Sequence, residues 1–166
     1  ADPEMIASKI REIFFSVNRC PVALPEQTLF QDGGGGDYEE TMEISQGRLC
    51  MGFITPVAIS HKDYIVMQIF NHLFGGGMTS KLFNQVREKM SLCYAIGSGY
   101  IGAKGIVTVN AGVDSDKCEL VKQEVLHQLQ LCCDGEITET GLTAAKEALL
   151  SSVRGVYDSS GSIESF

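Results

Sequence analysis

Residues 93–112, CYAIGSGYIGAKGIVTVNAG, contain two strand-like stretches separated by the turn-like Ala103-Lys104-Gly105. Strands are predicted over 93–98 and 106–112, where β-branched and other apolar residues alternate with small ones. A connection this short joins two strands as a hairpin, and the strands of a hairpin pair antiparallel. This stretch therefore predicts an antiparallel sheet at the centre of the fold.

Another strand and several helices are expected around this hairpin. Residues 47–56 alternate, with Leu49, Met51 and Phe53 on one side and Pro56 closing the strand. Apolar residues at helical spacing predict helices from Asp2 to Cys20-Pro21, over 64–74, after Thr79 or Ser80, over 116–133 and after Thr138. The order helix, strand, two helices, hairpin, two helices predicts an α+β two-layer sandwich: a mainly antiparallel sheet covered on one face by helices.

Four local features carry more specific expectations. Ser60 and Asp63 form a capping-box pattern ahead of helix 64–74, and Gly75 is expected to end that helix in a left-handed conformation. The run Gly33–Gly36 is expected to be an irregular loop. The residues that helix 116–133 is expected to bury are Leu120, Val121, Val125, Leu126 and Leu129.

Composition predicts one domain of a longer cytoplasmic protein. The 166 residues, 44% of them hydrophobic, suffice for a single core. The chain starts without methionine and stops inside a helical pattern, so we expect residues 1–166 to be a fragment truncated at both ends. The net charge of −8 disfavours nucleic acid or an anionic membrane surface as partner, and no apolar run reaches the roughly 20 residues of a transmembrane helix. Six cysteines without a Cys-x-x-Cys pair favour free thiols in a reducing compartment.

Two glycine-rich stretches are similar to nucleotide-binding motifs. Residues 97–102 have the Gly-x-Gly-x-x-Gly spacing, but the third glycine leads into a strand, not the helix that would hold a pyrophosphate. Gly75, Gly76 and Gly77 precede Lys81 without the Gly-Lys-Ser/Thr ending of a phosphate loop. A hairpin and a tight connection between packed helices explain the two stretches better, and a nucleotide-binding domain is the alternative they leave. The bare backbone of Gly75–Gly77 could also approach an extended peptide closely.

The sequence contains no recognisable catalytic motif. His61, His72 and His127 lie on different expected elements, and neither His-Glu-x-x-His nor His-x-x-Glu-His occurs, the patterns that put two zinc ligands and a base on one helical face. No Ser/His/Asp or Cys/His arrangement stands out. We therefore assign no catalytic residue, metal ligand or cofactor to this chain.

Arg87 and Tyr94 are the candidate binding residues, because they flank one expected helix-to-strand turn. A guanidinium can donate two parallel hydrogen bonds to an oxygen-bearing group, and a phenol beside it could steady an oxyanion. The two could therefore hold a peptide carbonyl. The alternative is a surface arginine at a helix C-terminus, where cations are favoured anyway, and a half-buried strand tyrosine.

Residues 74–94, FGGGMTSKLFNQVREKMSLCY, resemble the signature of the pitrilysin/insulinase family of zinc metallopeptidases, which includes mitochondrial processing peptidase. The resemblance is to the family's C-terminal, non-zinc homologous half. It implies a peptide substrate and a partner, either an N-terminal half or a homologous subunit, in a dimer or pseudo-dimer that closes around the peptide. Zinc would belong to that partner, so this chain should be inactive alone. Arg87 and Tyr94 would reach the substrate near its scissile carbonyl, and Gly75–Gly77 would lie by the crevice.

One residue departs from the family pattern. Ser91 stands where the family usually has glycine, and serine is less tolerant of positive φ, so the turn and the aim of Tyr94 could differ. The stretch 90–94 is also similar to a bacterial branch in which one of two paired paralogues has lost the zinc motif. A catalytically inactive structural or assembly subunit of the same family is therefore the alternative function.

Overall fold

The computed structural model describes residues 2–18, 22–23, 35–43 and 46–165. The expected helix end at Cys20-Pro21 and the first two glycines of Gly33–Gly36 lie outside these ranges. No helix among the described residues is both long and apolar enough to cross a bilayer.

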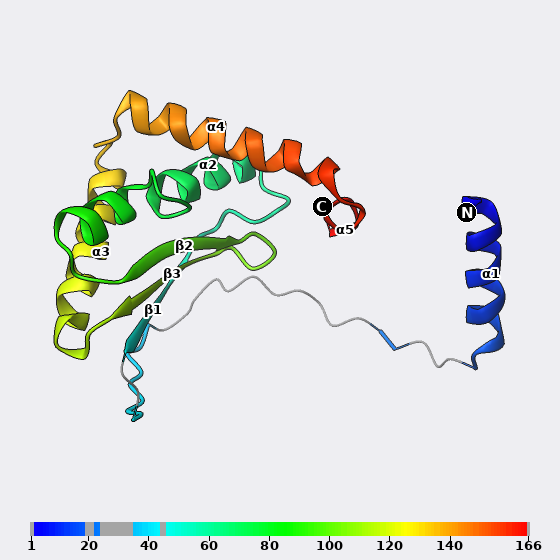
Figure 1. Ribbon diagram of the computed structural model, residues 1–166, viewed down its shortest axis with the longest axis horizontal. Helices are drawn as coiled ribbons and strands as arrows, with labels where there is room; N and C mark the ends of the chain where they lie inside the picture. Colours follow the sequence, from blue (N-terminus) through cyan, green and yellow to red (C-terminus); the bar gives the residue numbers. More distant parts are fainter. Residues whose placement is uncertain (1, 19–21, 24–34, 44–45, 166) are drawn as a thin grey trace.

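A three-stranded antiparallel sheet forms one layer of the fold. Strands β1 (Gly47–Ile54) and β2 (Ala95–Ile101) both pair with β3 (Ile106–Val113), giving the order β1-β3-β2. Figure 1 shows the helices α2, α3 and α4 together on one side of this sheet. The predicted hairpin and the α+β two-layer sandwich are therefore confirmed.

The helical layer is built mainly from segments that follow β1. They are α2 (Tyr64–Phe74), η1 (Phe83–Lys89, a π-helix), η2 (Ser115–Lys117), α3 (Cys118–Cys133), α4 (Glu139–Gly155), η3 (Val156–Asp158) and α5 (Ser160–Ser165). The largest fully buried side chains join these helices to the sheet: Phe74, Leu82, Val86, Val109, Val113, Val121 and Val125. The core therefore lies between the sheet and α2, η1 and α3.

The two faces of the sheet differ in side-chain size. Leu49, Met51 and Phe53 pack against the core, as the alternation predicts. On the opposite face Thr108 of β3 pairs with Gly52 of β1 and with Gly99 of β2. The centre of this face therefore carries little side-chain volume. The β1 residues on this face are exposed, and an antiparallel sheet can present one face to water or to a partner.

Helix α1 (Pro3–Ser16) begins as predicted but buries nothing. Asp2 caps it by accepting a hydrogen bond from the Glu4 N–H at 3.0 Å. None of its residues is buried, and Met5 and Ile13 are 62% and 55% exposed. Figure 1 shows α1 apart from the sheet and its helical cover, so its apolar stripe is not buried by the sheet or by the helices that cover it.

Three of the local predictions are wrong. Helix α2 begins at Tyr64 with no side-chain cap from Asp63, because the Asp63 N–H donates to His61 Nδ1 and the capping box does not form. Gly75 has φ −152° and ψ 7°, so its conformation is not left-handed; its carbonyl accepts the Ser98 N–H where the chain turns to run beside β2. Leu120 and Leu126 are 54% and 43% exposed. In α3 the buried stripe is Val121, Val125, Gln128 and Cys132.

Candidate functional site

The candidate site is the turn that joins η1 to β2. Ser80 starts the preceding helical segment, since its Oγ accepts the Phe83 N–H at 3.3 Å. The segment ends where the Ser91 N–H donates to the Arg87 carbonyl at 3.1 Å. Ser91 has φ +52°, the one positive φ among the non-glycine residues that the structure describes. The chain then enters the sheet as the Tyr94 N–H donates to Gly112 at 2.8 Å.

Ser91 thus adopts the left-handed conformation that a glycine would occupy without strain. The expected difference between a serine-containing and a glycine-containing turn does not appear in its φ angle. Serine accommodates the turn at the expense of backbone strain.

Arg87 lies on the last turn of η1 and is partly open to solvent. Its guanidinium stacks over the Phe83 ring at 4.7 Å, and its Nη1 lies 3.5 Å from Glu88 Oε1. The side chain remains 40% exposed. Burial raises the pKa of the Cys93 thiol, and the positive charge of Arg87 partly offsets this by lowering it. The charge of Arg87 therefore acts on Cys93, two residues before β2 begins.

Tyr94 belongs to a network that the sequence did not reveal. Its hydroxyl donates a short hydrogen bond to the Asp114 carboxylate, whose other oxygen accepts from Lys117 Nζ at 2.9 Å. The bond to Asp114 raises the pKa of Tyr94, and the bonds from Tyr94 and Lys117 lower the pKa of Asp114. The bond to Asp114 likewise raises the pKa of Lys117. The hairpin register was the available signal, since it brings the residue after β3 beside the residue before β2.

Arg87 and Tyr94 share no hydrogen bond with each other among the described residues. Arg87 is held by Phe83 and Glu88, and Tyr94 by Asp114. The structure therefore places both side chains at adjoining element ends, with Tyr94 49% exposed, but each is engaged with its own local partner.

The three glycines occupy different environments. Gly75 is buried, and its carbonyl accepts the Ser98 N–H at 2.8 Å. A Cβ on Gly75 would lie 2.7 Å from that same nitrogen, so this position requires glycine for a close approach to β2. Gly76 and Gly77 are exposed, and a Cβ on Gly77 would meet nothing within 4 Å. Only the latter two present an open backbone.

The described residues do not fit a zinc site. No group of three or more His, Cys, Asp or Glu side chains among them is placed to hold a metal ion. His61 lies 3.7 Å from Asp63, and His127 lies 3.6 Å from Glu124 on α3. These are isolated pairs, and zinc in proteins takes three or four protein ligands.

The geometry and the sequence together define an α+β domain with a partly exposed arginine and tyrosine at one turn. A sequence model of the family described as "Peptidase M16 inactive domain" matches residues 1–149. The chain therefore belongs to the peptidase M16 inactive domain family, and the resemblance to these zinc peptidases is confirmed.

Two curated relatives carry peptidase names. "Probable inactive metalloprotease YmfF" of Bacillus subtilis is 32% identical over 124 residues, which cover 75% of this chain and 29% of that protein. An "Uncharacterized zinc protease" of Rickettsia felis is 28% identical over 156 residues, covering 92% of this chain and 36% of that protein. The chain thus spans about a third of the length of these relatives.

Two solved structures share the fold. A conserved protein from Enterococcus faecalis matches 74% of this chain and 29% of its own with a TM-score of 0.70 and 29% identity. A protease from Helicobacter pylori matches 99% of this chain and 41% of its own with a TM-score of 0.82. At 20% identity the second match concerns the fold alone.

Proposed function

We propose that this chain is the peptide-holding domain of an M16-type zinc peptidase or of a peptidase homologue. In this proposal Arg87 and Tyr94 bind a main-chain carbonyl of the peptide, and Gly76 and Gly77 lie beside it. Family membership supports the role, as do the zinc protease and metalloprotease names of the relatives. Gly75 contributes by packing the loop onto β2.

The observation that carries this proposal is the Ser91 turn. It ends η1 and starts the path into β2 within a few residues, leaving Arg87 and Tyr94 partly exposed at the two adjoining ends. A guanidinium has five N–H donors, and among the residues that the structure describes only Glu88, at 3.5 Å, forms an ion pair with Arg87. Arg87 therefore keeps donors that could bind a carbonyl or carboxylate oxygen.

The proposed partner is an N-terminal half or a homologous subunit, giving a dimer or pseudo-dimer. Two features support this: the exposed apolar stripe of α1 and the small residues at the centre of the outer sheet face. The partner would hold any zinc, which when bound activates a water molecule for peptide hydrolysis. This chain would position the peptide and exclude water from it.

We also propose a cytoplasmic location. Five cysteines lie among the described residues and all are free thiols. Burial raises the pKa of Cys93 and of Cys132, which keeps these thiols protonated and unreactive. Free thiols in this number suit a reducing compartment.

The test is to substitute Arg87 and Tyr94 one at a time in the full-length protein. Peptide binding is then measured with the protein's natural partner present. Arg87→Ala should weaken binding roughly tenfold or more, because a hydrogen bond to a charged group contributes about 1.5–3 kcal/mol. Tyr94→Phe removes only the hydroxyl. The matched controls are Arg154→Ala on α4 and Tyr157→Phe, both exposed, and neither should change binding. Unchanged affinity in both Arg87→Ala and Tyr94→Phe would refute the peptide-holding role.

The Tyr94 network favours a second candidate, a catalytically inactive assembly subunit. In that case the bonds from Tyr94 and Lys117 to Asp114 serve only to fix the end of the hairpin, and Arg87 only covers Phe83. The two functions predict different losses. An assembly subunit would lose stability or partner affinity in these variants while peptide binding per assembled complex stayed the same.

A further inference from the structure

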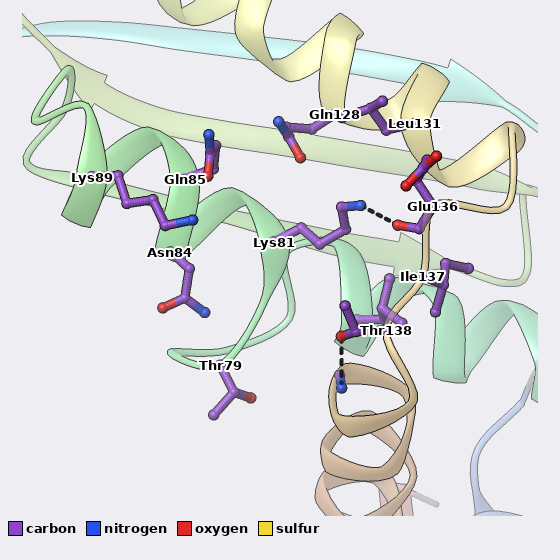
Figure 2. Close-up of a pocket in the computed structure, with 12 residues that line it drawn as sticks. Thr79, Lys81, Asn84, Gln85, Lys89, Gln128, Leu131, Glu136, Ile137 and Thr138 are labelled. Atoms are coloured by element: carbon purple, nitrogen blue, oxygen red, sulfur yellow. Dashed lines mark hydrogen bonds between the residues drawn. The ribbon is translucent and has the colours of Figure 1, made fainter.

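A cavity of about 340 Å³ lies on the helical side of the molecule, and neither Arg87 nor Tyr94 lines it. It is open on one side and bordered by the end of α2, the segment 79–89, the C-terminal half of α3, the loop after it and the start of α4 (Figure 2). Its volume falls at the lower end of the range of small-molecule sites in proteins. The cavity is thus large enough for a ligand of two or three amino-acid residues.

Two lysines give this cavity positive charge in a chain whose net charge is −8. Lys81 Nζ donates to the main-chain oxygen of Glu136 at 2.6 Å and forms no ion pair among the described residues. Lys89 forms neither a hydrogen bond nor an ion pair within that part of the chain. An ammonium has three donors, so both lysines keep donors that an anion could accept.

Gln128 adds a hydrogen-bond acceptor to the cavity wall. The residue is 5% exposed, and its Nε2 donates to Glu124 Oε1 at 2.7 Å. Its carbonyl oxygen has no partner among the described residues, yet no side-chain polar atom there is both sealed from solvent and unpaired. The oxygen is therefore reachable from the cavity. Figure 2 shows Gln85 and Gln128 between Lys89 on one side and Lys81 on the other, with Lys81 directed toward Glu136.

We propose that this cavity binds the carboxyl-terminal end of a peptide. Lys81 and Lys89 bind the terminal carboxylate, and the carbonyl oxygen of Gln128 accepts the last peptide N–H. A carboxylate with an N–H donor nearby satisfies both the two ammonium groups and the Gln128 carbonyl oxygen. Glu136 is also a lining residue, and its negative charge disfavours an ion with more than one negative charge, such as phosphate.

This site goes beyond the proposed function and does not require it. It is lined by Asn84, Gln85 and Lys89, which lie on η1 together with Arg87. A bound peptide end would therefore touch the helix that carries Arg87 without touching Arg87 itself. Binding here should be unchanged in Arg87→Ala, which separates a failure of this inference from a failure of the peptide-holding role.

The test is calorimetric titration of the full-length protein with acetyl-trialanine as the free acid, with its C-terminal amide and with inorganic phosphate. The free acid should bind, and the amide should bind about tenfold more weakly or not at all. Lys89→Gln should weaken binding of the free acid by several-fold, and Lys81→Gln should weaken it to a similar extent. Lys146→Gln, an exposed lysine on α4 outside the cavity, is the matched control and should bind like the wild type.

Lys89→Gln is the decisive variant, because Lys89 forms no hydrogen bond or ion pair with any residue that the structure describes, so the substitution removes no such contact there. The inference is overturned if the free acid does not bind up to roughly 10 mM, or if acid and amide bind equally. It is also overturned if phosphate competes with equal affinity, or if both lysine variants bind like the wild type.

Discussion

Ser91→Gly should make the domain more stable. The left-handed conformation destabilises a non-glycine residue by about 1–2 kcal/mol. Glycine avoids this strain, but its larger loss of backbone entropy on folding costs about 0.5–1 kcal/mol relative to alanine. The Ser91 side chain is exposed and makes no hydrogen bond among the described residues. The N–H of residue 91 still donates to Arg87 after the change. The difference predicts a gain of about 0.5–1 kcal/mol.

The assay is urea unfolding, with thermal unfolding as a second measurement. A domain of this size shifts its Tm by about 2–4 °C for each kcal/mol, so the expected rise is about 1–4 °C. The m value should not change, because the surface exposed on unfolding is the same. Ser91→Ala is the control: alanine meets the same strain as serine and should give no gain. A Ser91→Gly protein no more stable than the wild type, or a stabilised Ser91→Ala, would refute the strain argument.

Three further outcomes follow from the site. Gly75→Ala should destabilise by about 1–3 kcal/mol, because its Cβ would lie 2.7 Å from the Ser98 nitrogen. Gly77→Ala, with open space around it, should keep a free energy of unfolding within about 0.5 kcal/mol of the wild type. Urea unfolding measures both variants, and an equal loss of stability in the two would contradict this difference. Asp114→Asn should lower the pKa of Tyr94 toward its usual value of about 10, and an unchanged phenolate absorbance titration would show that the bond to Asp114 is not the cause. The pKa of Asp114 is lowered in the folded protein, so its carboxylate stabilises the fold at any pH above the usual aspartate pKa of about 4. This stabilisation is lost as the pH falls through the lowered pKa. The loss of stability in Asp114→Asn should accordingly be present at neutral pH and disappear in acid; a loss that persists in acid would contradict the assigned charge effect.

The sheet could be predicted because its signals are local. The alternation of Leu49, Met51 and Phe53 sets which face is buried, and the short connection after Ile101 sets the antiparallel pairing of β2 and β3. Helix α3 was harder to predict, because it has more apolar residues than one face can bury. Leu120 and Leu126 stay in solvent, and only the position of the sheet decides which stripe turns inward.

The site could be predicted only where one turn contains it. Arg87 and Tyr94 are close in sequence, so the helix-to-strand pattern brings them to one place. Asp114 reaches Tyr94 from 20 residues away through the strand register, and the Lys81 contact with Glu136 spans 55 residues. Such contacts depend on how whole elements pack, which the pattern of a single segment does not specify.

The hydrogen bond to Asp114 makes the two candidate binding residues unequal. A phenol has one proton to donate, and in this structure that proton goes to Asp114. A peptide carbonyl can therefore accept a hydrogen bond from Tyr94 only after the hydroxyl leaves the carboxylate, and that exchange cancels much of what the new bond contributes. Arg87 meets a weaker competitor: its Nη1 lies 3.5 Å from Glu88 Oε1, and its stacking on Phe83 leaves the other N–H donors of the guanidinium available. If this domain holds a peptide, Arg87 must contribute most of the affinity, and removing the Tyr94 hydroxyl should reduce binding less than removing the guanidinium.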